Sequence, residues 1–355
     1  MKKILFIIII LSAMKGYTQY FVPFGKDSLW RPNSWSVIEA MYKDSNQLYI
    51  GGVSCIYGGP NQINNIGVWD NNEWTTFDNG FGSANSGTTC FMKYKDFFYM
   101  GGFFSNIQNI PQTGHICRFN GTNWEAVANS YGEVNSNVFD MVVFDTLLIV
   151  GGGFSTIGSQ YGNFNRIAAY NGTDYINIGS FIGFGIYALA VYNNELYAGG
   201  GMMTIQKYLG NQQWEDVGGN FDYWVQDMQV DTFNNLLYVC GGFNVADDTI
   251  ETDNIAVWDG FRWTKIGYGS GDVNNVNTMA FYRGDLYCNT NNTTAGGVYT
   301  GYLPKWDGTD WSPGVPGGLN FEVNSLVVFD DMLYIGGGAT GPGPMDTAQR
   351  TLARW

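Results

Sequence analysis

Histidine is nearly absent from this sequence, since His115 is the only one among 355 residues. A catalytic triad of the Ser-His-Asp or Cys-His kind would depend wholly on that side chain. We therefore interpret His115 as a structural or solvent-exposed residue. The sequence shows no recognisable catalytic constellation, and on this basis we do not expect an enzyme.

Basic residues are also scarce. The chain has 17 Lys and Arg against 31 Asp and Glu, which gives a formal net charge of −14. Nucleic acids and anionic membrane surfaces attract positively charged proteins, so neither is expected as a partner. Charged residues make up only 14% of the chain, whereas 45% are hydrophobic and 17% aromatic. This composition predicts a folded protein with a large core.

Long apolar runs are missing after the N-terminus, so we expect no transmembrane segment. Residues 1–19 have the layout of a secretory signal peptide, with Lys2 and Lys3 ahead of the apolar run from Ile4 to Leu11. No cysteine follows this run, so a lipoprotein anchor is not indicated. The sequence predicts an exported protein, secreted or at the cell surface, with an undefined cleavage site.

A short segment, IAVWDGFRW at residues 255–263, recurs in variant forms along most of the chain. An Asp-Gly or Asn-Gly pair between two aromatic-containing runs predicts a β-hairpin with a tight turn. The aromatic residues recur so regularly that we assign them to packing rather than to ligand binding. The tryptophans of this pattern are Trp69, Trp74, Trp124, Trp214, Trp258, Trp263, Trp306 and Trp311.

A second signature precedes each hairpin, namely an apolar run that ends on paired glycines. The copy at residues 286–291 has lost its glycines, and the others recur with a period of about 42 to 50 residues once that copy is counted. Periods in this range indicate solenoids or propellers. The pairs are Gly51 and Gly52, Gly101 and Gly102, Gly151 and Gly152, Gly199 and Gly200, Gly241 and Gly242, and Gly336 and Gly337.

Each repeat supplies a first strand, the strand that ends in glycines, a variable loop and the hairpin. Seven such sets predict a seven-bladed β-propeller of four-stranded antiparallel blades, forming one all-β domain over residues 20–355. The last copy ends at Trp355 after its third strand. Residues 20–25 resemble the fourth strands and would close the ring. The alternative is that the sequence stops before that strand and before a C-terminal sorting or anchoring module.

An apolar strand that ends in Gly-Gly, followed by two aromatics, resembles the kelch-type repeat. The fuller pattern resembles secreted bacterial propellers and the fungal cortical polarity-marker family, over about residues 20–355. It departs from standard kelch in the spacing of the two aromatics, which are five residues apart in most copies. The resemblance implies a propeller that serves as a binding scaffold. Galactose oxidase, a kelch-like copper enzyme, needs two histidines, and this chain lacks a second one.

Candidate binding residues are expected where the repeats differ. In a propeller of this strand order, the loops between second and third strands share one face with the connections between blades. The fourth repeat has almost no such loop, running from Met202 straight to Tyr208, and this gap would admit a ligand to the central depression. A tolerated loop deletion explains the gap equally well.

One acidic loop is a weak candidate for calcium. Asp247, Asp248, Glu251 and Asp253 lie within seven residues, and such carboxylates suit a hard cation. The loop lacks the alternating spacing and the turn glycine of calcium loops, so we favour a solvated acidic loop and expect no metal or other cofactor.

Five cysteines lack the spacing of metal ligands, and the odd number leaves at least one unpaired. Cys90 and Cys117 fall on strands separated by another strand, so we predict no bond between them. Cys240 and Cys288 lie on equivalent strands of neighbouring repeats, where buried free thiols are favoured over a disulfide. Cys55 completes the set.

These features predict an exported, non-catalytic binding or adhesion module for a protein or glycan, acting through the loop-rich face. The competing interpretation is a secreted glycan hydrolase or lyase that uses loop carboxylates. Carboxylates gathered in a deep central pocket would favour the enzyme, and an open aromatic or polar rim would favour the binding module. The sequence identifies neither the ligand nor the oligomeric state.

Overall fold

The computed structural model describes residues 37–57, 63–70, 74–75, 87–127, 132–158, 164–179, 181, 183–267, 273–338 and 352–355. The predicted signal peptide at residues 1–19 and the predicted closing strand at residues 20–25 lie outside these ranges. The same is true of the loop at residues 339–350.

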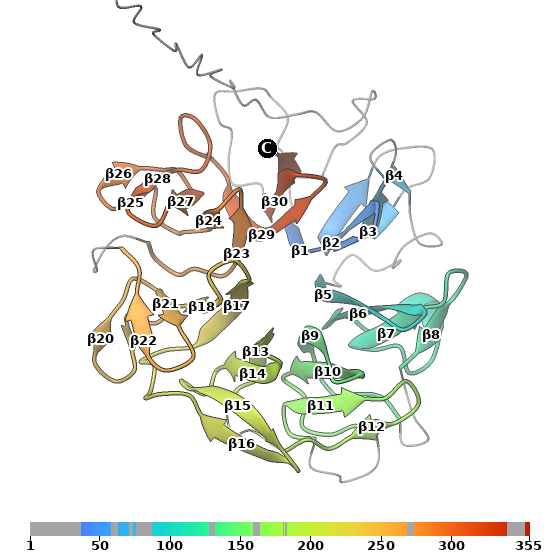
Figure 1. The fold of residues 1–355 in the computed structure, drawn as a ribbon. Coiled ribbons are helices and arrows are strands. Elements are labelled where there is room, and N and C mark those ends of the chain that lie inside the picture. Colours follow the sequence, from blue (N-terminus) through green and yellow to red (C-terminus); the bar gives the residue numbers. More distant parts are fainter. Residues whose placement is uncertain are drawn as a thin grey trace, which may run out of the picture.

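The described chain is almost entirely β-structure, arranged as sheets around a central axis in the manner of a propeller (Figure 1). Six four-stranded antiparallel blades are present in it. Blade 1 has β1 (Val37–Asp44), β2 (Gln47–Tyr57), β3 (Ile63–Trp69) and β4 (Trp74–Thr75). Blade 2 has β5 (Gly87–Tyr94), β6 (Phe97–Phe103), β7 (Ile116–Phe119) and β8 (Trp124–Ala126), with the short 3₁₀ helix η1 (Ile107–Asn109) between β6 and β7.

The next two blades follow the same order of strands. Blade 3 has β9 (Val138–Phe144), β10 (Leu147–Gly152), β11 (Ile167–Tyr170) and β12 (Tyr175–Ile176). Blade 4 has β13 (Ile186–Tyr192), β14 (Glu195–Gly200), β15 (Ile205–Gly210) and β16 (Gln213–Asp216).

Blades 5 and 6 each carry an extra small hairpin between their second and third strands. Blade 5 has β17 (Val225–Asp231), β18 (Leu236–Gly241), β21 (Ile255–Trp258) and β22 (Trp263–Lys265), with the hairpin β19 (Val245–Ala246) and β20 (Ile250–Glu251). Blade 6 has β23 (Met279–Tyr282), β24 (Asp285–Cys288), β27 (Pro304–Trp306) and β28 (Trp311–Pro313), with the hairpin β25 (Thr294–Ala295) and β26 (Val298–Tyr299).

Three further strands lie between blade 6 and blade 1, namely β29 (Glu322–Phe329), β30 (Met332–Gly338) and β31 (Leu352–Arg354). The strand β29 contacts both β23 and β1, so the innermost strands follow one another around the ring (Figure 1). Val37 of β1 also pairs with Gly338 of β30. Because only three strands of this unit are described, the predicted count of seven four-stranded blades stays a prediction.

The short turns between first and second strands follow the sequence prediction. Asn193 and Asn194 both have positive φ, as do Asp330 and Asp331. This geometry is that of a type I′ turn, which matches the twist of the strands that it joins. These turns and the hairpin turns lie on one side of the ring, which we call the turn face. The opposite side carries the loops between second and third strands and the connections between blades, and we call it the loop face.

The paired glycines are explained by a bulge in the innermost strand. In blade 3 the pairing skips Phe139, so that Val138 pairs with Gly152 and Asp140 with Gly151. A Cβ on Gly152 would lie 2.2 Å from the Asn137 carbonyl oxygen, and one on Gly151 would lie 2.7 Å from Ile186 of the next blade. The second glycine therefore admits the bulge, and the first admits the neighbouring blade.

Blades 5 and 6 do not have a glycine pair at the positions that it occupies in blade 3. In blade 5, Gly241 pairs with Val225 and Cys240 occupies the position of the first glycine, so the predicted pair Gly241 and Gly242 lies one residue too late in the strand. In blade 6 the position falls on Asn289, which is buried. Its side-chain oxygen accepts hydrogen bonds from the backbone of Asn277 and Thr278 at 2.6 and 3.0 Å. In blade 6, which lacks the glycines, the side chain of Asn289 thus supplies a hydrogen-bond acceptor for the backbone amides just before the innermost strand.

Tyrosines at the ends of innermost strands join adjacent blades. The hydroxyl of Tyr94 donates to the carbonyl of Thr146 at 2.7 Å, and that of Tyr192 donates to the carbonyl of Asn235 at 2.9 Å. Both acceptors lie in or beside the first turn of the following blade. These bonds satisfy buried polar groups and fix the angle between successive blades.

The cysteines with described side chains contribute to the packed core. Cys90, Cys117, Cys240 and Cys288 are buried free thiols, in agreement with the prediction from strand spacing. Cys240 and Cys288 belong to one hydrophobic cluster between blades 5 and 6. Burial raises the pKa of all four thiols, so they are poor nucleophiles.

Candidate functional site

The recurring tryptophans lie within the blades. Trp69, Trp124, Trp263 and Trp311 are buried, and Trp214, Trp258 and Trp306 are half-buried, while the side chain of Trp74 lies outside the described residues. The indole of Trp263 donates to the carbonyl of Val217 at 2.8 Å, and that of Trp214 donates to the carbonyl of Ile178 at 2.7 Å. Each acceptor belongs to the preceding blade, so these two side chains join blades.

The four acidic residues considered for calcium are spread over the β19–β20 hairpin and the chain that follows it. The Asp247 carboxylate accepts a hydrogen bond from the Gly219 amide at 2.5 Å, and Asp248 accepts one from the Asn220 amide at 3.2 Å. Glu251 is exposed, whereas Asp253 is buried. Within the described ranges, no three carboxylate, histidine or cysteine side chains gather as metal ligands do. Asp247 and Asp248 instead hold the connection from blade 4 to blade 5.

His115 lines a pocket of about 530 Å³ on the loop face between blades 2 and 3. The pocket is polar, and its other titratable residue is Glu133, which accepts a hydrogen bond from the Gly114 amide at 3.1 Å. The Nδ1 atom of His115 is buried and has no hydrogen-bond partner among the described residues.

The connection between the second and third strands of blade 4 is short. Residues 201–204 alone join β14 to β15 there, whereas residues 104–115 join the corresponding strands of blade 2 and residues 242–254 those of blade 5. The short connection expected from the sequence at blade 4 is therefore present, and the ligand entry proposed for it stays a prediction.

Exposed hydrophobic side chains come from the connections on either side of this short loop and from the loop itself. Phe184 comes from the connection into blade 4, Met203 from the short loop, and Tyr223 and Trp224 from the connection out of blade 4. Their exposed fractions are 84%, 45%, 42% and 38%. We call these four residues the blade 4 patch. The rings of Tyr223 and Trp224 lie 3.9 Å apart at 38°, so they present one tilted aromatic surface.

The blade 4 patch continues toward the inner ring of strands. A Cβ on Gly201 would lie 3.0 Å from the Cβ of Phe184 and 3.5 Å from the hydroxyl of Tyr187. Tyr187 in turn packs edge-on against Phe139, with ring centroids 5.1 Å apart. Phe139 and Tyr187 occupy the bulge positions of β9 and β13, and both are half-buried. Aromatic side chains thus extend from the rim to the innermost strands.

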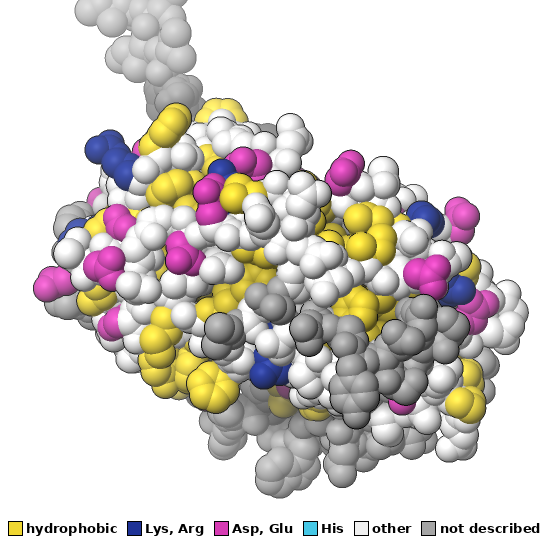
Figure 2. Space-filling view, turned by 90° about the horizontal axis from the view of Figure 1, so that it is seen from below, with side chains coloured by type: hydrophobic (Ala, Val, Ile, Leu, Met, Phe, Trp, Pro, Cys, Tyr) yellow, Lys and Arg dark blue, Asp and Glu magenta, His cyan; other side chains and the backbone are white. Residues whose placement is uncertain are grey.

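On the outer flank of the ring, hydrophobic and acidic side chains are mixed. Figure 2 views the ring from the side of β12 and β16, where hydrophobic side chains reach the surface among acidic ones. Acidic groups outnumber basic groups in this view, in keeping with the net charge of −14. Single exposed apolar side chains are normal on a protein surface, so exposure alone does not indicate a site.

Three carboxyl groups on the innermost strands have raised pKa values. Burial raises the pKa of Glu39 and of Asp140 to about 7, and that of Asp227 to about 6. Asp140 accepts a hydrogen bond from the Leu189 amide of blade 4 at 2.7 Å. Asp227 accepts one from the Met279 amide of blade 6 at 3.0 Å. Both aspartates therefore tie their blade to the next.

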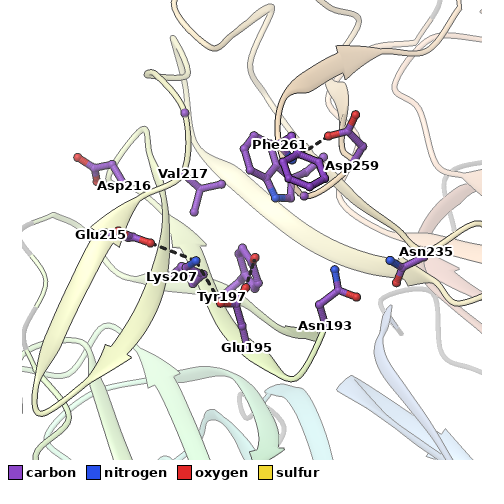
Figure 3. Close-up of a pocket in the computed structure, with 13 residues that line it drawn as sticks. Asn193, Glu195, Tyr197, Lys207, Glu215, Asp216, Val217, Asn235, Asp259 and Phe261 are labelled. Atoms are coloured by element: carbon purple, nitrogen blue, oxygen red, sulfur yellow. Dashed lines mark hydrogen bonds and ion pairs between the residues drawn. The ribbon is translucent and has the colours of Figure 1, made fainter.

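A pocket of about 360 Å³ opens on the turn face between blades 4 and 5 (Figure 3). On one side, the ammonium of Lys207 lies 3.1 Å from Glu195 and 3.1 Å from Glu215. Hydrogen bonds from Lys207 to Glu215 and then to Glu195 raise the pKa of this ammonium. Tyr197 donates to Glu195 at 3.0 Å.

Two aromatic side chains of blade 5 also line this pocket. Trp258 and Phe261 come from the hairpin of blade 5, and Phe261 is 91% exposed. Figure 3 shows the Phe261 ring beside the side chain of Asp259 and across the pocket from Lys207. The backbone amides of Arg262 and Phe261 lower the pKa of Asp259, because they stabilise its carboxylate.

Sequence reasoning located the gap at blade 4 but not the pocket on the turn face. The signal for that pocket was present, since the hairpin of blade 5 has Phe261 where Thr122, Thr173 and Thr309 stand in other hairpins. The aromatic residues of the blade 4 patch lie in blade connections outside the repeating segments, so periodicity gave no signal for them.

No family model and no curated protein matches this sequence. One similar solved structure is the extracellular domain of a protein named as a one-component system from B. thetaiotaomicron, with a TM-score of 0.62, 13% identity, and coverage of 95% of this chain and 40% of that one. Another is Ika8, a computationally designed protein, with a TM-score of 0.55, 15% identity, and coverage of 92% of this chain and 98% of that one. This chain therefore spans about two fifths of the length of the first structure.

The comparisons and the topology agree on the architecture. At these identities the likeness shows the fold alone. Among the residues that the structure describes, no helix has the length and apolar character that a membrane span requires. The chain is an all-β protein with the fold of a β-propeller.

Proposed function

We propose that this protein is an exported, non-catalytic binding or adhesion module that captures a protein or a glycan on its loop face. The blade 4 patch is the observation that carries this proposal. It exposes aromatic side chains beside the short β14–β15 connection and continues inward through Tyr187. Aromatic side chains supply much of the binding energy at protein interfaces, and their flat apolar surfaces also suit the C–H faces of sugars.

The location and the ring closure belong to the same proposal. Residues 1–19 act as a signal peptide that is removed on export, and the mature protein is secreted or held at the cell surface. The fold similarity to an extracellular domain supports this location. We also propose that β29, β30 and β31 are three strands of a seventh kelch-like blade, whose fourth strand is supplied by residues 20–25.

A carboxylate-dependent glycan hydrolase or lyase is the second candidate. The raised pKa values of Glu39, Asp140 and Asp227 on the innermost strands favour it, because a general acid needs such a pKa. The hydrogen bonds of Asp140 and Asp227 to neighbouring blades count against it, since they give these carboxyls a structural role. We therefore favour the binding module.

The test is a binding screen of the mature chain against a glycan array and a set of extracellular proteins, with product release monitored for every glycan bound. We expect binding without turnover, weakened by at least about tenfold in Trp224→Ala. Phe233→Ala is the matched control, because Phe233 is 94% exposed but lies in the β17–β18 turn on the opposite face. Turnover abolished by Glu39→Gln or Asp140→Asn would favour the enzyme.

A further inference from the structure

The hairpin turn of blade 5 carries an aromatic residue that the turn does not need. In the described part of the chain, four hairpins open with an Asp or Asn side chain whose oxygen accepts hydrogen bonds from the backbone amides two and three residues later. These residues are Asn120, Asn171, Asp259 and Asp307. In two of them, the hydroxyls of Thr173 and Thr309 also bond to the same oxygen, at 2.9 and 2.8 Å. Phe261 takes this position in blade 5 and contributes only its backbone amide.

The phenyl ring of Phe261 gains little from the fold. It is 91% exposed, although burying an aromatic ring is strongly favourable. Threonine at the same position would form the same turn with an added hydrogen bond. The ring therefore has no evident structural role in this turn, but it does line the pocket between blades 4 and 5.

The equivalent gap between blades 2 and 3 is closed by cationic side chains. Lys95 donates to the carbonyl of Asn171, and Arg118 donates to that of Gly172 at 3.4 Å. Both carbonyls belong to the hairpin turn of blade 3. At blades 4 and 5, Lys207 occupies the position of Arg118 but bonds to Glu195 and Glu215 of its own blade. Lys207 therefore does not bond to the hairpin turn of blade 5 as Arg118 bonds to that of blade 3, and a pocket opens beside that turn (Figure 3).

The charges in the pocket restrict the ligand. The lining carries four carboxylates, on Glu195, Glu215, Asp216 and Asp259, against the one ammonium of Lys207, which is paired with both glutamates, so the pocket would repel an anion. A ligand with hydroxyl groups and an apolar face suits both the charged side chains of blade 4 and the aromatic side chains of blade 5. Its hydroxyls would bond to the carboxylates and to the amides of Asn193 and Asn235, which also line the pocket. The volume of about 360 Å³ lies near the lower end of the roughly 300–1,000 Å³ typical of small-ligand pockets.

We propose that this pocket binds a neutral sugar unit, with one face of the ring stacked on Phe261. Lys207, Glu195 and Glu215 form the polar wall and hold its hydroxyl groups. The site is on the face opposite the blade 4 patch, so it is a second binding site that does not depend on the function proposed for the loop face.

The experiment is a titration of the mature protein with methyl glycosides of glucose, galactose, mannose and N-acetylglucosamine, followed by saturation-transfer NMR and calorimetry. Phe261→Thr restores the residue of the other hairpins and should leave the fold intact. We expect at least one glycoside to bind, and its affinity to fall by roughly tenfold or more in Phe261→Thr. Lys207→Met should weaken the same glycoside, because the polar wall loses its donor and its charge balance.

Two controls separate this site from the loop face. Phe233→Thr removes another exposed phenyl of the turn face that does not line the pocket, and it should bind the glycoside as the wild type does. Trp224→Ala alters the blade 4 patch and should also leave this binding unchanged. The proposal is overturned if none of the glycosides binds at millimolar concentration, or if binding is equal in the wild type and Phe261→Thr.

Discussion

The hairpin turns of blade 3 and blade 5 occupy the same place in the repeat, but the preceding blade bonds to the first turn and leaves a pocket beside the second. The turn of blade 3 receives hydrogen bonds from Lys95 and Arg118, which close the space beside it. The turn of blade 5 faces a pocket that contains Lys207 and carries the exposed ring of Phe261. Side chains that recur in each blade hold the propeller together, and those that break the pattern become available for a ligand.

A large effect is expected from a substitution of a glycine at the bulge. Gly152→Ala would place a Cβ 2.2 Å from the Asn137 carbonyl oxygen, so we expect a loss of about 2–4 kcal/mol in the free energy of unfolding. Gly153→Ala is the matched control, because its Cβ has no neighbour closer than 3.5 Å. Urea denaturation measures both variants. Equal stability of the two would contradict the role given to the paired glycines.

The two aromatics of the blade 5 hairpin should differ almost as strongly. Trp263 is buried and bonds to Val217, so Trp263→Ala should cost about 3–5 kcal/mol in a fold that tolerates the cavity poorly. Phe261→Thr should change stability by less than about 0.5 kcal/mol, because the ring is exposed. Thermal and urea unfolding would check this, and a large loss in Phe261→Thr would show that the ring is structural after all.

Arg118 beside the blade 3 turn and Lys207 beside the blade 5 turn should also differ in their contribution to stability. Arg118 lies 4.0 Å from the Phe97 ring and bonds to Glu125 at 3.0 Å as well as to Gly172. Arg118→Met should therefore cost about 1–2 kcal/mol. Lys207→Met breaks partly exposed ion pairs and should cost less than about 1 kcal/mol. If Lys207→Met proves the more destabilising in chemical denaturation, the pocket wall is a structural element.

A further prediction concerns pH. Burial first, and then the charge of Asp227, raises the pKa of Asp140 to about 7 from an ordinary value of 3.8. Because of the raised pKa, the folded state holds the Asp140 proton more tightly than the unfolded state does. The stability that this proton contributes is therefore complete below about pH 4 and is lost as pH rises through 7. Asp140→Asn removes this dependence. The stability difference between variant and wild type should move in the variant's favour from pH 4 to pH 8, as thermal melts can measure. A difference that stays constant with pH would contradict the raised pKa.

Much of the fold followed from the sequence because its determinants are local and repeated. The Asn193–Asn194 turn, the hairpin at Asp259 and Gly260, and the paired glycines each specify a backbone geometry wherever they occur. The register of blade 5 was missed, since Cys240 stands in a glycine position and only strand pairing reveals it. The small hairpin β19–β20 was missed too, because its turn uses Asp247 and Asp248 at positive φ in place of glycine.

The candidate sites could be predicted only in part. The short connection at residues 201–204 marked the gap, since loop length can be read from the repeat period. The exposure of Phe184 and Trp224 depends on how the blade connections pack, and no periodic signal encodes it. The structural role of Asp140 and Asp227 depends on backbone amides of adjacent blades, which lie about fifty residues away in sequence.

The most direct test of the binding function is the affinity of the mature protein for its screened ligand, measured for the wild type and for the combined variant Phe184→Ala, Tyr223→Ala and Trp224→Ala, with product release followed in parallel. Our account predicts that the variant stays folded, that binding falls by about a hundredfold or more, and that neither protein releases product. Unchanged binding in the combined variant, or turnover by the wild type, would contradict it.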